Sequence, residues 1–135
     1  MTNLPSLGIK RAFEDIIVNE LKLNYVQDAF TTGVKKDVQV MITDFSTEYT
    51  RPRLNSPALA AEMSLPINIF SENNETAVHK AVFDLIKVAP THPKLIEFRI
   101  DEIYPTSSFT NYNNESSNGH VQAQVTLLIK YIIRL

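Results

Sequence analysis

The fold of this chain is decided by the stretch HVQAQVTLLIKYIIRL, residues 120–135. Apolar side chains occupy every odd position from Val121 to Leu135, and polar ones occupy most of the even positions between them. Side chains alternate between the two faces of a β-strand, so this pattern predicts one long strand with an apolar face. Leu128 and Ile132 break the alternation because they are apolar at even positions. We therefore expect that half of the second face to be covered, by this chain or by another chain.

Apolar periodicity in the rest of the chain predicts two helices and three further strands. Apolar residues recur every three or four positions, the spacing of an amphipathic helix, over residues 6–22 and 74–88. Alternation of apolar and polar residues predicts strands over residues 37–45, 62–70 and 95–104.

The predicted order is α-β-β-α-β-β, within a length that suits one domain, residues 1–135. Two helices with one apolar stripe each can cover one face of a four-stranded sheet. We therefore expect a two-layer α+β fold with both helices on one face of a mostly antiparallel or mixed sheet. Proline, asparagine and serine are frequent over residues 46–61 and 105–119, which predicts two long loops.

The composition excludes several classes of function. The net charge is −2, so the chain has no global positive field to gather nucleic acid. The absence of cysteine excludes disulfides and thiolate metal sites, and only three glycines are present, which argues against a glycine-rich phosphate loop. Residues 1–10 lack the apolar core of a secretory signal, and we find no apolar run that predicts a transmembrane helix.

The residues that usually carry catalysis are not arranged for it. His79, His92 and His120 have no metal-ligand spacing between them, and each is expected to be a surface histidine. Asp101 and Glu102 are neighbours on a predicted strand, so they point to opposite faces and make a poor acid–base pair. We therefore expect no catalytic site, no metal and no cofactor.

The sequence gives a stronger indication of an interface than of catalysis, because it has more apolar residues than one core needs. Met41, Phe45, Leu128 and Ile132 are expected on the sheet face that the helices do not cover. A monomer rarely leaves a large contiguous apolar patch in water, so these four residues are predicted to form a subunit interface in a ring or dimer. The alternative is that the long loops fold back over this face.

The two long loops contain the other candidate contact residues. Arg51 and Arg53 flank a proline in an extended segment, which suits contact with an acidic partner or a nucleic-acid backbone, although a solvated loop is the favoured interpretation. Tyr49 and Tyr112 lie in or beside loops, and exposed aromatic residues are enriched at interfaces.

Taken together, these features resemble the tail terminator (tail completion) proteins of long-tailed bacteriophages. The resemblance rests on the order α-β-β-α-β-β, on the opening helix LGIKRAFEDIIVNELK, and on the end of the chain. There, a segment EFRIDEIYP is followed by a polar loop and then by HVQAQVTLLIKYIIRL.

The resemblance implies a structural virion protein that forms a ring, typically of six copies, on the end of the tail tube. Such a ring stops tube polymerisation and presents a surface to the head-side connector protein. The implied partners are the protein itself, the tube protein, the connector and, as a further candidate, the sheath protein. The implied location is the tail of the virion, assembled in the host cytoplasm, with DNA passing through the ring without sequence-specific recognition. Tyr49, Arg51, Arg53 and Tyr112 are our expected contacts to the tube or connector, based on their loop positions.

Two other readings of the sequence stay open. One alternative is another head–tail joining or baseplate protein. The other is a small ligand-binding or catalytic α+β domain, which would have a compact pocket with convergent polar groups between the sheet and the long loops.

Overall fold

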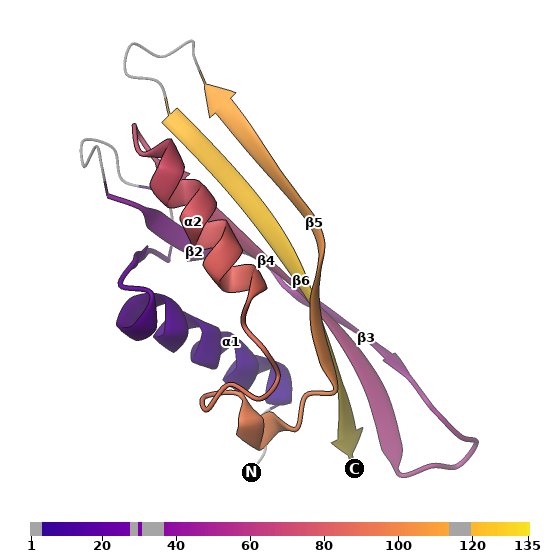
Figure 1. Ribbon diagram of the computed structural model, residues 1–135. Helices are drawn as coiled ribbons and strands as arrows, with labels where there is room; N and C mark the ends of the chain where they lie inside the picture. The colour runs from indigo at the N-terminus through magenta and orange to yellow at the C-terminus, as the bar shows by residue number, and fades with distance from the viewer. Residues whose placement is uncertain (1–3, 28–29, 31–36, 114–119) are drawn as a thin grey trace.

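The computed structural model describes residues 4–27, 30, 37–113 and 120–135, except for the side chains of residues 113 and 120. In this part of the chain two α-helices pack against a mixed sheet of six strands, which confirms the α+β class (Figure 1). The helices are α1 (Pro5–Asp15) and α2 (Glu75–Ile86). The strands are β1 (Asn24–Tyr25), β2 (Gln39–Ile42), β3 (Ser46–Thr50), β4 (Ala58–Ser71), β5 (Glu102–Asn113) and β6 (His120–Arg134).

The sheet has the order β1-β2-β4-β6-β5, and β3 pairs with the other half of β4. The β1–β2 pair is parallel, and the other pairs are antiparallel. The predicted number of four strands is wrong for two reasons. The predicted strand at residues 37–45 is present as the shorter β2, and a further strand, β3, forms in the predicted loop 46–61; both lie along one edge of β4. The two-residue strand β1 adds one more, in a segment expected to be a connection.

The core lies on one face of this sheet, as the alternation of β6 predicts. The odd-numbered residues of β4 and β6 are buried from Met63 to Ile69 and from Val121 to Tyr131. Both helices add residues to the same buried cluster, including Ile9 and Phe13 from α1 and Val78, Ala81 and Leu85 from α2. The two helices therefore cover the same face.

The first helix is extended by a different kind of turn. A π-helix, Ile16–Glu20, follows α1, and the Leu21 backbone N–H donates to the Ile16 carbonyl at 2.9 Å. Lys22 then adopts a left-handed φ of 58°, which ends the helical segment. The second helix begins with a cap, because the Asn74 side chain accepts a hydrogen bond from the Ala77 N–H at 3.1 Å.

The strand predicted over residues 95–104 is wrong in most of its length. Residues Ile96–Phe98 form a short 3₁₀ helix, and Arg99 has a left-handed φ of 52°, which interrupts an extended chain. The strand β5 begins only at Glu102, so the apolar alternation of this segment instead serves a turn that buries Leu95 and Ile100.

Both long loops are shorter than expected. The range 46–61 contains β3 and the start of β4, so that residues 51–57 alone connect them as a hairpin. The range 105–119 contains most of β5, which pairs with β6 as far as Asn113. Backbone pairing with the long apolar strand β6 outweighs the weak strand propensity of this polar stretch. Pro105 is tolerated because it lies on the outermost strand, beside a β-bulge between Pro105 and Ser107.

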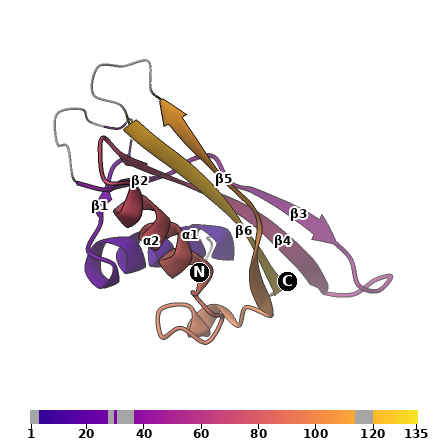
Figure 2. The same cartoon turned by 45° about the horizontal axis from the view of Figure 1, so that its top comes forward.

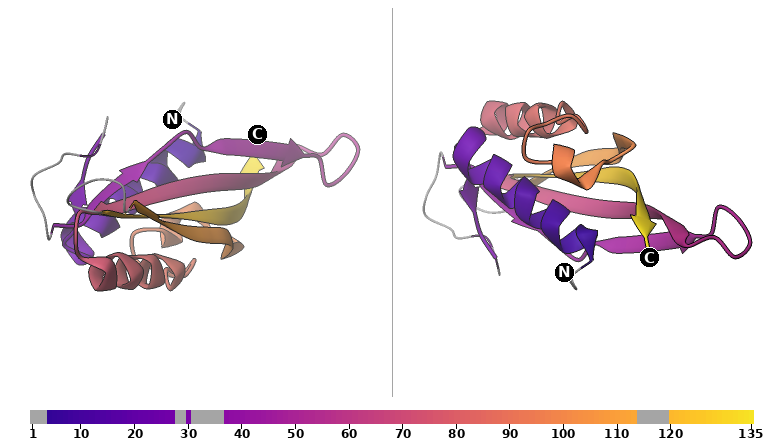
Figure 3. Two further views of the ribbon diagram at one scale, coloured as in Figure 1. Left: turned by 90° about the horizontal axis from the view of Figure 1, so that it is seen from above. Right: turned by 90° about the horizontal axis from the view of Figure 1, so that it is seen from below.

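The β3–β4 hairpin extends well beyond the helical layer. Figures 1 and 2 show its connecting loop at the far right of the molecule, clear of both helices, and both views of Figure 3 show the same projection. The sheet is therefore longer than the layer that covers it.

Candidate assembly surface

The sheet face opposite the helices carries several exposed apolar side chains. We call it the open face; it consists of the even-numbered residues of β4 and β6 and the residues of β2, β3 and β5 in register with them. Leu128 and Ile132 lie on this face, as their even positions predict. Ile132 is 41% exposed and Leu128 is half-buried, while on β5 Tyr104 is 36% and Phe109 50% exposed.

One end of the open face is covered by the chain itself. The Phe30 ring stacks on the Phe70 ring with centroids 4.9 Å apart, and Phe70, Gln39 and Asn68 are buried. Met41 lies opposite Asn68 near this end and is half-buried. Phe30, which covers this end, belongs to neither of the two predicted long loops, so the cover is not the one that the alternative named. Leu128 and Ile132 lie towards the other end of the face.

A row of polar side chains follows the covered end. The Asn68 Nδ2 donates to the Thr43 hydroxyl at 3.2 Å, and the Gln124 Nε2 donates to the Asn68 Oδ1 at 3.0 Å. Because these hydrogen bonds join the residue after β2 to β4 and β6, the row satisfies polar groups that are partly buried on this face.

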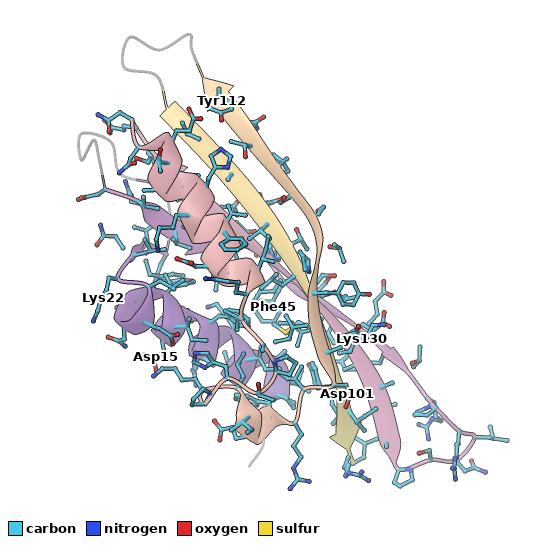
Figure 4. The ribbon with its side chains drawn as sticks, in the orientation of Figure 1. Asp15, Lys22, Phe45, Asp101, Tyr112 and Lys130 are labelled. Carbon is cyan, nitrogen blue, oxygen red and sulfur yellow. The ribbon has the colours of Figure 1, made fainter. Side chains whose placement is uncertain are left out.

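At the uncovered end of the open face, charged side chains lie between the apolar residues. The Lys130 Nζ lies 3.7 Å from a Glu62 carboxylate oxygen, 3.9 Å from a Glu102 carboxylate oxygen, and 5.7 Å from the centre of the Tyr104 ring (Figure 4). Leu128 and Ile132 flank Lys130 along the strand. A partner that covers these two apolar residues must therefore also accommodate the charged cluster. This requirement favours a specific interface over non-specific hydrophobic association.

The placement of Phe45 on the open face is wrong. From Ile42 to Ser46 the chain takes four steps, whereas the paired residues of β4, from Ile67 to Ser64, take three. The extra residue forms an irregularity of the β-bulge type, and it reverses which residues face the helices. Phe45 consequently packs against the helix-side core, where it lies in Figure 4, and only Met41, Leu128 and Ile132 remain as predicted interface residues.

The four predicted loop contacts do not come together. Tyr49 lies on β3 and is 42% exposed, and Arg51 and Arg53 lie in the adjoining connection. Tyr112 lies towards the far end of β5, on the helix side, and its hydroxyl is 3.3 Å from the His79 Nε2 on α2 (Figure 4). Partial burial and the nearby Glu75 carboxylate raise the pKa of Tyr112.

The end of the β3–β4 hairpin, residues 51–56, is held by its own hydrogen bonds. We call it the tip. The Ser56 N–H donates to the Arg53 carbonyl at 3.2 Å, and the Arg51 guanidinium donates to the Ser56 carbonyl at 2.8 Å. Asn55 has a φ of 61°, the left-handed conformation that a type II turn needs at its third position. At the corner of this turn Leu54 is 91% exposed.

A cleft that the sequence did not predict lies between the ends of the two helical segments. We call it the interhelical cleft; its volume is about 560 Å³. It is lined by the π-helix, the C-terminal end of α2 and the connection that follows, namely by Ile16, Glu20, Leu21, Asp84, Lys87, Val88, Ala89, Thr91, His92 and Pro93. The sequence pattern could not reveal this cleft, because its two walls come from segments that lie about seventy residues apart in the chain and meet only in the folded structure.

A histidine–glutamate pair bridges these walls. The His92 Nε2 lies 2.7 Å from a Glu20 carboxylate oxygen, and the His92 Nδ1 accepts a hydrogen bond from the Lys94 backbone N–H at 3.1 Å. Because Nδ1 is an acceptor, the proton of the neutral ring sits on Nε2 and is donated to Glu20. Asp84, on the other wall, pairs with Lys80 at 2.9 Å and with Lys87 at 3.4 Å. Both acidic groups of the cleft thus have partners that hold them in place.

The described residues do not form a metal site, since no group of three His, Cys, Asp or Glu side chains among them lies close enough to hold an ion. In the same part of the chain, no helix has the length and apolar character needed to cross a membrane.

Two comparisons with known proteins give no relative. No protein-family model matches this chain, and no curated protein matches its sequence.

Proposed function

We propose that this protein is a structural subunit of a phage tail that forms a ring, of six copies by the resemblance, on the end of the tail tube. The ring stops further addition of tube subunits and offers a surface to the head-side connector. The observation that carries the proposal is an open sheet face with exposed apolar residues beside a hairpin that projects past the helices. The likeness of the chain to tail terminator proteins supports the same function.

The physical basis of this proposal is directional association between identical chains. In the described part of the sheet, β3 pairs with β4 alone and β5 with β6 alone, so each leaves one edge available for backbone hydrogen bonds. Surfaces that differ on the two sides of a subunit form heterologous contacts, which close into a ring when the rotation between neighbours permits. A closed ring ends a growing tube because it consumes the surface on which the next subunit would dock.

The two ends of the sheet suit the contacts with other tail components. Tyr49, Arg51 and Arg53 are proposed contacts at one end of the sheet and Tyr112 at the other, towards the tube or the connector. Under this proposal the sheath protein is a further partner, DNA passes through the ring, and assembly takes place in the host cytoplasm. No catalytic step and no cofactor belong to this function.

The interhelical cleft favours a second candidate, a small ligand-binding domain. Its volume falls within the range of small-molecule sites. Against this candidate, both ring nitrogens of His92 are already engaged, and Asp84 is neutralised by two lysines. Few polar groups are left to converge on a ligand, so we rank this function second.

The test mixes the purified chain with purified tail tubes and examines them by negative-stain electron microscopy. The proposal predicts rings, or one density cap at one tube end, and a block of further tube growth when tube protein is added. A chain that leaves both tube ends bare and tube growth unchanged, but that binds a metabolite as a monomer, would favour the ligand-binding candidate.

A further inference from the structure

We propose that the tip of one subunit docks into the interhelical cleft of the next subunit, with Leu54 in the cleft and Arg53 paired to Glu20. This inference rests on the proposed ring, since it names the contact that joins its subunits. It also narrows the expected partner of Arg53 from the tube or connector to a second copy of this chain.

The tip has the properties of a docking element. Leu54 is nearly fully exposed although it is apolar, and the turn that carries it is fixed by the Arg51 and Ser56 hydrogen bonds. A segment already held in its bound shape loses little conformational entropy on binding. Arg53 is exposed and makes no ion pair with any described residue, so its charge is available to a partner.

The cleft has the complementary properties. Its walls carry apolar side chains from Ile16, Leu21 and Val88, and its volume of about 560 Å³ is ample for a leucine side chain and an adjoining arginine stem. Of its carboxylates, Asp84 is already paired with two lysines, whereas Glu20 is half-exposed and is bound by His92. A guanidinium arriving at the rim therefore meets Glu20, which has oxygen lone pairs free for it.

The two surfaces cannot meet within one molecule. Figures 1 to 3 show the hairpin connection at the opposite side of the molecule from the π-helical end of α1. A contact between tip and cleft must therefore join two copies head to tail, which is the heterologous arrangement that a ring requires. The tip also continues into the open face, because Ala58 at the hairpin base pairs with Arg134 and Ala60 pairs with Ile132. The same neighbour can thus cover Ile132.

The absence of cysteine in this chain permits a direct test by disulfide trapping. We would mix two single-cysteine variants of the full chain, Leu54→Cys at the tip and Thr91→Cys at the cleft, and oxidise them under mild conditions. A disulfide forms only when the two Cα atoms come within about 7 Å, so the mixed product reports the proposed contact. The matched control replaces Thr91→Cys by Thr76→Cys, another exposed threonine, which lies at the opposite end of α2 from the cleft.

The expected result is a mixed 54–91 product that forms on the order of tenfold faster than the 54–76 product, because docking raises the effective concentration of the pair. Arg53→Glu should remove this advantage, and Arg53→Glu combined with Glu20→Arg should restore it, with thermal melting confirming that each variant is folded. Equal rates for the two mixtures would overturn the inference. Rings or capped tubes without the 54–91 product would leave the proposed function standing and reject this contact, whereas the product without rings or caps would reject the function and keep the contact.

Discussion

At the scale of single residues, Tyr131 combines a ring whose burial is favourable with a hydroxyl whose burial is not. Its ring is buried on the helix side of β6, its oxygen makes no hydrogen bond to a described residue, and its burial raises the pKa of Tyr131. The polar side chains of Thr47 and Ser6 act to lower this pKa, but neither meets the geometry of a hydrogen bond to the Tyr131 oxygen. A buried hydroxyl without a partner costs about 1–3 kcal/mol, so the ring stabilises the fold while its oxygen opposes it.

We therefore expect Tyr131→Phe to leave the free energy of unfolding unchanged or to raise it by about 1 kcal/mol. Chemical denaturation followed by circular dichroism measures this difference. As a control, Tyr131→Ala should lower the free energy of unfolding by about 3–5 kcal/mol, because it removes the ring as well. A loss of more than about 1 kcal/mol in Tyr131→Phe would mean that the hydroxyl has a partner after all.

At the scale of elements, the packing of α1 against the 3₁₀ helix depends on a glycine. A Cβ added at Gly8 would lie 2.6 and 2.8 Å from two atoms of the Phe98 ring, closer than side chains normally pack. We expect Gly8→Ala to lower the free energy of unfolding by about 1 kcal/mol, although alanine favours a helix.

A second background separates the two effects of that substitution. In a Phe98→Ala chain the clash is absent, so Gly8→Ala should instead raise the free energy of unfolding by about 1 kcal/mol. Urea unfolding of the four chains measures this change of sign. The same sign in both backgrounds would show that Phe98 does not restrict Gly8.

The end of α1 is tied to the connection after α2 by an ion pair. The Lys94 Nζ lies 2.7 Å from an Asp15 carboxylate oxygen, and this hydrogen bond, helped by one from Asn19, lowers the pKa of Asp15 below its ordinary value of about 3.8. A carboxyl with a lowered pKa in the folded state stabilises the fold above its ordinary pKa, and that stability is lost as the pH falls through the lowered value.

We therefore expect the melting temperature to fall more steeply below about pH 4 in the natural chain than in Asp15→Asn. The difference should be small because both partners are exposed to water. Thermal melts at a series of pH values from about 6 to 2 test this, with Glu97→Gln as a control that should keep the natural profile. Identical acid profiles for the natural chain and Asp15→Asn would contradict a stabilising role of this pair.

The sequence predicted these elements unevenly, and the reasons are physical. Long strands and helices with a regular apolar period, such as β6 and α2, were predictable because one face of each is buried. Phe45 was misplaced because one extra residue before β3 reverses the alternation, and nothing in the local pattern marks such a bulge. The polar residues of β5 gave no strand signal, because their pairing comes from β6 rather than from their own propensity.

The same limit applied to the candidate site. The alternation of β6 predicts which of its residues face away from the helices, so the position of Leu128 and Ile132 on the open face could be predicted. The interhelical cleft could not, because Glu20 and His92 are 72 residues apart and only the packed helices bring them together.

At the scale of the whole molecule, the sheet is longer than the helical layer that covers it. One end of its open face is closed by the Phe30–Phe70 stack, and the other keeps Leu128 and Ile132 around the Lys130 cluster. The projecting tip and the interhelical cleft lie at opposite sides. Together these features give a subunit with unlike surfaces on its two sides, which is what directional assembly needs.

Sedimentation equilibrium of the natural chain and of Leu128→Glu/Ile132→Glu tests most directly whether the open face serves contact between copies. We expect a mass above the 15.3 kDa of one chain at high concentration for the natural protein and monomers for the double variant, with little change in melting temperature. Phe83→Glu, which charges an exposed apolar residue on the outside of α2, should associate as the natural chain does. A natural chain that stays at 15.3 kDa at every concentration, or a double variant that unfolds, would show that the open face does not serve contact between copies.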